Sequence, residues 1–234
     1  MFDRIRKAFS RGRGKDRSDP AGTISQLAHG PVSEWARTQG LGFSTDDGGE
    51  GITLQGQVGG RPWRLQLGRP SRKYIFGEEV RARAELGLRD DVAVLIINRP
   101  LRDALEKQAY EIYTDPLQTT ISPNLTEEMR WLAMFREVGW DSLPKDFSGR
   151  YAILSDNRDN ALAWLNPRLI RATLDWPAPG PSPQVPFMIV LLRGKAYLRM
   201  EYTPADFLTL QHAALIFTTA CEAALSGLRP NAPK

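Results

Sequence analysis

The sequence predicts an α+β protein in which antiparallel β-hairpins and small sheets pack with several helices, the last of them long and C-terminal. Two observations lead to this class. Short segments with alternating apolar and polar residues occur in pairs around tight turns, which is typical of hairpins. Helical segments interrupt them at irregular intervals, whereas a parallel sheet needs a regular alternation of strand and helix.

The first elements are a helix and a hairpin. The apolar spacing predicts a helix over Val32–Gln39, which ends before a glycine. Ile52–Val58 and Trp63–Leu67 alternate in polarity on either side of a Gly59-Gly60 pair. Glycine adopts the left-handed backbone of a two-residue turn without strain, so these segments predict a hairpin.

Two more strands complete the first half. Val80–Leu86 alternates in polarity and is bracketed by Gly77 and Gly87 at strand length. Val92–Ile97 is uniformly apolar and follows a pair of aspartates. A short apolar run bounded by turn residues indicates a strand that is buried on both faces.

Proline beside a capping residue marks four later helix starts. Proline is accepted in the first turn of a helix, where its missing N–H has no partner to lose. The predicted segments are Pro100–Tyr113, Asn124–Val138, Asp159–Trp176 (divided in two at Pro167) and Pro204–Leu225.

The last helix is the longest. Thr203 and Asp206 together resemble a capping box at its start. Its apolar spacing places Leu208, Ala214 or Leu215, and Ala224 or Leu225 on the inward face.

Three strands and a proline-rich loop lie between these helices. Arg150–Leu154 predicts a short strand, and Phe187–Leu192 with Ala196–Tyr202 predicts a second hairpin. The loop Pro177–Pro186 contains five prolines and is expected to be a stiff, exposed connector.

The domain organisation is predicted as an arm and a body. Residues 1–22 form a basic, flexible N-terminal arm rich in Gly, Ser and Arg. A boundary near Asp115-Pro116 would divide the body into lobes of residues 23–115 and 116–234. One continuous domain is the alternative.

Composition excludes several classes of protein. The chain has 234 residues, 41% hydrophobic and 25% charged, which is typical of a soluble globular protein. No run of apolar residues is long enough for a membrane span. A single cysteine excludes internal disulfides and indicates a reducing compartment, so a cytoplasmic location is expected. With two histidines besides, we expect no metal site and no cofactor.

The net charge of +4 is concentrated in the arm. Residues 1–17 contain seven basic and two acidic side chains, whereas residues 18–234 contain 24 basic and 25 acidic ones. The near-neutral body argues against a dedicated nucleic-acid-binding surface.

No catalytic motif is present. The sequence lacks the glycine-rich dinucleotide and phosphate loops, the nucleophile elbow and the zinc-protease motif. His212 in the last helix is interpreted as a surface or half-buried side chain, and Cys221 as a small buried thiol. An enzyme without a recognisable motif remains an open alternative.

Tryptophan is the remaining candidate for a binding site in the body. The six tryptophans are spread along the chain, and most are expected in the core. Trp176 lies beside the proline-rich loop and is the candidate to line a groove.

The arm carries the other candidate contacts. Phe2, Ile5 and Phe9 have helical spacing and would form an apolar stripe. Such a stripe flanked by cations suits an anionic membrane surface or nucleic-acid phosphates. The flanking cations are Arg4, Arg6, Lys7, Arg11, Arg13 and Lys15.

The sequence therefore predicts a protein-interaction module, with an unknown protein partner, whose arm contacts the cytoplasmic face of an anionic membrane. A nucleic-acid-associated protein that uses the same arm is the less favoured alternative.

Overall fold

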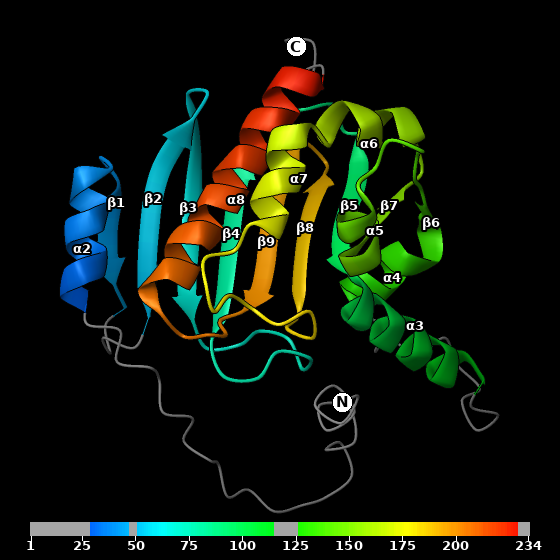
Figure 1. The fold of residues 1–234 in the computed structure, drawn as a ribbon, viewed down its shortest axis with the longest axis horizontal. Coiled ribbons are helices and arrows are strands. Elements are labelled where there is room, and N and C mark those ends of the chain that lie inside the picture. The colour runs from blue at the N-terminus through cyan, green and yellow to red at the C-terminus, as the bar shows by residue number, and fades with distance from the viewer. Residues whose placement is uncertain (1–28, 47–50, 115–125, 229–234) are drawn as a thin grey trace, which may run out of the picture.

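The computed structural model describes residues 29–46, 51–114 and 126–228 (Figure 1). Its centre is one nine-stranded sheet of order β1-β2-β3-β4-β9-β8-β5-β7-β6, in which every pair of neighbours is antiparallel. The strands are β1 (Gly42–Thr45), β2 (Ile52–Val58), β3 (Arg61–Gly68), β4 (Glu79–Glu85), β5 (Ala93–Asn98), β6 (Arg136–Glu137), β7 (Tyr151–Ser155), β8 (Phe187–Leu192) and β9 (Lys195–Glu201).

The helices form layers on both sides of this sheet, so the α+β class is confirmed. They are α2 (His29–Thr38), α3 (Arg99–Thr114), α4 (Glu127–Met134), α5 (Lys145–Arg150), α6 (Arg158–Trp164), α7 (Pro167–Leu174) and α8 (Phe207–Gly227).

Both predicted lobes contribute to the one sheet. The hairpin of β8 and β9 inserts between β4 and β5, and β7 pairs with β5 on the other side. The described residues of the two predicted lobes therefore share a sheet and its cores. The boundary at residues 115–116 falls outside the described part of the chain and stays a prediction.

The larger core lies between the sheet and α8. Figure 1 shows α8 and α7 crossing the near face of the sheet. Trp164 is fully buried there, and its indole N–H donates to the carbonyl oxygen of Ala220 at 2.9 Å. The ring of Phe217 packs edge-on against Trp63, with centroids 6.3 Å apart. The apolar residues of α8 thus stabilise the fold by burial against the sheet.

The opposite face of the sheet is only partly covered. A second core packs α3 and α4 against β5, β7 and β8, with Leu95, Leu101 and Leu154 among its buried residues. Figure 1 shows these two helices at the end of the sheet away from α2. Among the described residues, the helix that packs extensively on β2, β4 and β9 is α8, on the near face, and no helix packs extensively on the opposite face of these strands or of β3. We call this uncovered surface the open face.

Most predicted elements are confirmed to within a few residues. The hairpin over Ile52–Val58, the buried strand near Val92–Ile97, the hairpin starting at Phe187 and the helix break at Pro167 all appear. The expected helix over Asn124–Val138 is shorter, because the chain becomes extended after Met134 and joins the sheet as β6.

The start and inward face of the last helix differ from the prediction. Asp206, not Thr203, is the N-cap, because its carboxylate accepts the backbone N–H of Thr209. Leu208 and Leu215 are 51% and 47% exposed, so they lie on the outer face. Of the predicted alternatives, Ala214 and Ala224 are the buried ones. The inward face combines such small residues with large apolar ones, among them Leu210, Ile216 and Phe217.

By length and composition α8 could cross a membrane. Of its most apolar window, 61% is buried inside the fold. A core helix of a soluble protein has the same composition, so we assign α8 to the core.

Candidate functional site

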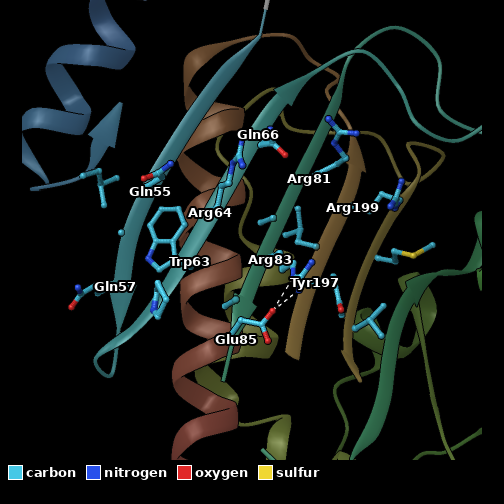
Figure 2. Close-up of a pocket in the computed structure, with 18 of the residues that line it drawn as sticks. Gln55, Gln57, Trp63, Arg64, Gln66, Arg81, Arg83, Glu85, Tyr197 and Arg199 are labelled. Atoms are coloured by element: carbon cyan, nitrogen blue, oxygen red, sulfur yellow. Dashed lines mark hydrogen bonds and ion pairs between the residues drawn. The ribbon is translucent and has the colours of Figure 1, made fainter. Parts of the chain in front are cut away.

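The open face carries polar side chains in register across neighbouring strands. On β4, Arg81, Arg83 and Glu85 alternate with buried apolar residues, so all three project to this side. Figure 2 shows Arg64, Arg81, Arg83 and Arg199 on this face of three strands, β3, β4 and β9.

Two pairs of these arginines face each other directly. Arg64 on β3 is opposite Arg83 on β4, and Arg81 on β4 is opposite Arg199 on β9. Directly opposed residues on antiparallel strands have Cβ atoms about 5 Å apart, and like charges there are destabilising. The fold therefore maintains four guanidinium groups in an arrangement that repulsion opposes.

Two of the four arginines have carboxylate partners. Arg83 is paired with Glu85 on its own strand. The hydrogen bonds from Arg83 and Lys195 lower the pKa of Glu85, although its partial burial acts in the opposite direction. Arg199 donates to Glu79, which is fully buried, at 2.6 Å.

The other two arginines have no carboxylate partner in the part of the chain that the structure describes. Arg64 donates only to the hydroxyl of Thr53, at 3.5 Å. Arg81 forms no ion pair with any described residue, and its Nε is buried without a hydrogen-bond partner. A buried donor left without a partner costs about 1–3 kcal/mol, more when it is charged.

A further arginine of the groove, Arg72, is held by a residue of α4. Arg72 donates to Glu128 of α4 at 2.6 Å, and Tyr74 donates to the same oxygen at 3.2 Å. Glu128 is 1% exposed. Burial acts to lower the pKa of Arg72, but the hydrogen bond to Glu128 and the nearby negative charges, taken together, raise it. Burial, with the charge of Glu128, also raises the pKa of Tyr74 well above its usual value.

These side chains lie in a groove of about 1140 Å³ over the open face. The turn between α2 and β1 lines one end, and α4 lines the other. Amide side chains from β2 and β3 line one part of the groove. The arginines lie at its centre, and apolar groups lie toward α4. Lining residues include Gln55, Gln57, Gln66, Arg64, Arg81, Arg83, Arg199, Tyr197, Met188, Val190 and Trp131.

Guanidinium, amide and carboxylate groups dominate the polar lining of the groove. Of the described residues that line it, none is His, Cys, Ser, Thr or Lys. Its acidic and phenolic side chains are those of Glu85, Glu127, Glu128 and Tyr197. Its guanidinium and amide groups can recognise anionic and hydrogen-bonding surfaces.

The predicted contact residues of the arm, from Phe2 to Lys15, lie outside the described residues. Trp176 is half-buried against Phe187 and His212. It borders a cavity of only about 10 Å³, room for about one water molecule, and does not line the large groove. Its role in binding stays a prediction.

His212 and Cys221 have the surroundings expected from the sequence. The Nε2–H of His212 donates to the carbonyl oxygen of Ala172 at 2.8 Å, and burial lowers the pKa of the ring. Cys221 is fully buried, which raises the pKa of its thiol to about 12. Within the described ranges, no three His, Cys, Asp or Glu side chains gather where they could hold a metal ion.

Sequence reasoning did not single out the arginines of the groove. Their only sequence signal is the alternation of Arg81, Arg83 and Glu85 with apolar residues in the predicted strand over Val80–Leu86. Such alternation predicts a half-buried strand but does not tell a solvated face from a groove.

Comparisons with known proteins add little. No protein-family model matches the sequence, and no curated protein matches it. Among solved structures, the chain is similar to the crystal structure of the mycobacterial trehalose monomycolate transport factor A, TtfA. The identity is 11%, the TM-score is 0.47, and the alignment covers 86% of this chain and 96% of that one.

Proposed function

We propose that the protein is a protein-interaction module that holds an acidic segment of a partner protein in the groove. The observation that carries this proposal is the pair Arg64 and Arg81, which have no carboxylate partner among the described residues and face other arginines. A bound carboxylate would relieve both the repulsion and the unpaired donor. Arginine binds carboxylates through paired, charge-assisted hydrogen bonds.

The rest of the lining suits a polypeptide occupant. Gln55, Gln57 and Gln66 offer amide donors and acceptors that can bond to an extended main chain. The volume exceeds the 300–1,000 Å³ or so of typical small-molecule pockets. The chain's own arm does not fit, because residues 1–17 carry seven basic side chains and would be repelled.

The aromatic residues of the groove argue against nucleic acid. Proteins that bind single strands stack bases on exposed aromatic rings. Trp63 and Trp131 are only 4% and 9% exposed. The ring of Tyr197 is covered by Arg83, whose guanidinium carbon is 5.9 Å from the ring centroid.

Fluorescence anisotropy with a labelled glutamate-rich peptide tests the proposal on the full chain. We expect saturable binding that weakens with salt, and a lysine-rich peptide of the same length should not bind. Arg64→Glu should weaken binding at least about ten-fold, because it introduces repulsion at the centre of the groove. Arg168→Glu is the matched control, since Arg168 is an exposed residue of α7 paired with Glu222 of α8, outside the groove.

Three results would contradict this function. The first is equal binding of the acidic and basic peptides. The second is an equal loss of affinity in Arg64→Glu and Arg168→Glu, which would indicate a general charge effect. The third is tighter binding of a single-stranded oligonucleotide than of the acidic peptide, which would favour the nucleic-acid alternative.

For the arm we propose attachment to the anionic cytoplasmic face of a membrane, which would place the module there. The support is compositional: Phe2, Ile5 and Phe9 have helical spacing among seven cations. Each basic residue near an anionic surface contributes about 1 kcal/mol, so attachment would be reversible.

Sedimentation with vesicles tests this attachment. The full chain should bind phosphatidylserine-containing vesicles and not pure phosphatidylcholine. Replacing Phe2, Ile5 and Phe9 with Ser keeps every charge and should abolish sedimentation. If the triple variant sediments like the native chain, apolar insertion is not involved and this proposal fails.

A further inference from the structure

The charges of the groove divide into paired and unpaired sets. Arg83, Arg199 and Arg72 each have a carboxylate partner, namely Glu85, Glu79 and Glu128. Arg64 and Arg81 have none in the described parts of the chain. These two arginines therefore present two positive charges without a carboxylate beside them among the described residues, and a bound group with two negative charges would balance them.

The two unpaired arginines are close enough to share one ligand group. Arg64 is opposite Arg83, and Arg81 is two residues before Arg83 on the same strand and face. Arg64 and Arg81 are thus diagonal neighbours about 7–8 Å apart, within reach of long side chains. Together their guanidinium groups offer about ten N–H donors.

We infer that Arg64 and Arg81 form a subsite for a phosphate monoester, carried by a phosphorylated side chain of the acidic segment. This inference rests on the proposed function and names the modification that controls it. A phosphate monoester has a charge near −2 at neutral pH and three strong acceptor oxygens. A carboxylate or a phosphodiester has one negative charge and would leave one guanidinium uncompensated.

The surroundings supply the rest of such a subsite. Gln66 lines the groove directly opposite Arg81, so an amide lies beside the guanidinium group. The buried Nε of Arg81 has no acceptor among the described residues. The groove extends well beyond this pair, which leaves room for the residues flanking a phosphorylated side chain.

Three peptides of otherwise identical sequence test the inference by anisotropy. One has serine at the centre of a glutamate-rich sequence, the second has phosphoserine there, and the third has aspartate. Phosphoserine should raise the affinity of the native chain at least about ten-fold over serine, and aspartate should give a smaller gain. In Arg64→Gln/Arg81→Gln the gain from phosphorylation should vanish, whereas Arg168→Gln should keep it.

The pH provides a second readout. The second pKa of phosphoserine is near 6, so the gain should decline as the pH falls below about 6. The aspartate peptide should not show this decline in the same range. Thermal unfolding of the double variant checks that it is folded, and a folded variant is expected because the substitutions remove opposed charges.

The outcomes separate this inference from the proposed function. If the serine peptide binds and phosphorylation adds nothing, the phosphate subsite is wrong while the acidic-segment groove stands. If neither peptide binds, both fail. If inorganic phosphate binds as tightly as the phosphoserine peptide, the subsite serves a small molecule. If phosphatidic acid vesicles bind more tightly than that peptide through Arg64 and Arg81, the ligand is a lipid. Either of these last results overturns the inference.

Discussion

Arg81 and Arg199 lie directly opposite each other on β4 and β9, yet only Arg199 has a carboxylate partner among the residues that the structure describes. Glu79 neutralises Arg199 from two residues before Arg81 on the same strand. Arg81 lies on the same face of β4 as Glu79, but its buried Nε has no acceptor in the described part of the chain. A pair of cations held this way lowers stability, and proteins retain such arrangements mainly where they bind something.

We therefore predict that Arg81→Gln stabilises the protein while it weakens peptide binding. Removing the charge opposite Arg199 and the unpaired Nε should raise the free energy of unfolding by about 0.5–1 kcal/mol. Urea unfolding followed by circular dichroism measures this change. Arg168→Gln, which removes an exposed charge elsewhere, should change stability by less than about 0.5 kcal/mol. A destabilised Arg81→Gln would mean that this arginine is structural.

Glu79 is predicted to stabilise the fold, whereas Arg81 is predicted to act in binding. Its carboxylate is fully buried and accepts hydrogen bonds from Arg199 and from the backbone N–H of Ser71. Glu79→Gln would leave Arg199, which is 21% exposed, without its main partner. We expect a loss of about 3 kcal/mol in urea unfolding.

The exposed pair on the same strand gives the comparison for Glu79. Glu85→Gln removes the partner of Arg83, and both side chains of that pair are about half exposed. Exposed ion pairs contribute at most about 1 kcal/mol. Equal losses in Glu79→Gln and Glu85→Gln would show that burial does not determine the role of these carboxylates.

Much of the fold could be predicted because its signals are local. Phe187–Leu192 is uniformly apolar, and the turn after it is short, so the hairpin follows from the sequence alone. β1 was missed because Gly42–Thr45 has only four residues, three of them exposed, and depends on pairing with β2. The start of α8 was misplaced because two capping residues, Thr203 and Asp206, compete there.

The groove could not be predicted because distant segments form it. Arg64, Arg81 and Arg199 belong to three strands, and β9 reaches β4 across more than a hundred residues of sequence. The strand alternation indicates which side chains share a face, but the sequence does not show which face α8 covers. Local patterns in the sequence favour the arm instead, because its seven cations all fall within residues 1–17.

Acid should destabilise the protein in part through His212. The ring packs on Trp176 with centroids 4.7 Å apart, and burial lowers its pKa below 6.5, against smaller opposing effects of the Ala172 carbonyl and Asp175. The unfolded chain then binds the proton more readily, so stability falls as the pH drops below about 6.5 toward the lower folded-state pKa. From about pH 7 to pH 5, the melting temperature of the native protein should fall more than that of His212→Gln. Equal slopes would show that His212 does not contribute.

The end of α8 should tolerate no side chain at Gly227. A Cβ atom there would lie 1.9 Å from the carbonyl oxygen of Ala163 in α6, and a backbone atom cannot move aside cheaply. Gly227→Ala should therefore lower the free energy of unfolding by about 1–3 kcal/mol, measured in urea. Gly30→Ala in α2 is the matched control, because a Cβ at Gly30 has nothing within 4 Å. That substitution should stabilise the helix by up to about 1 kcal/mol, since alanine loses less backbone freedom on folding. If both variants shift stability in the same direction, the close approach of α8 to α6 is not what requires glycine at this position.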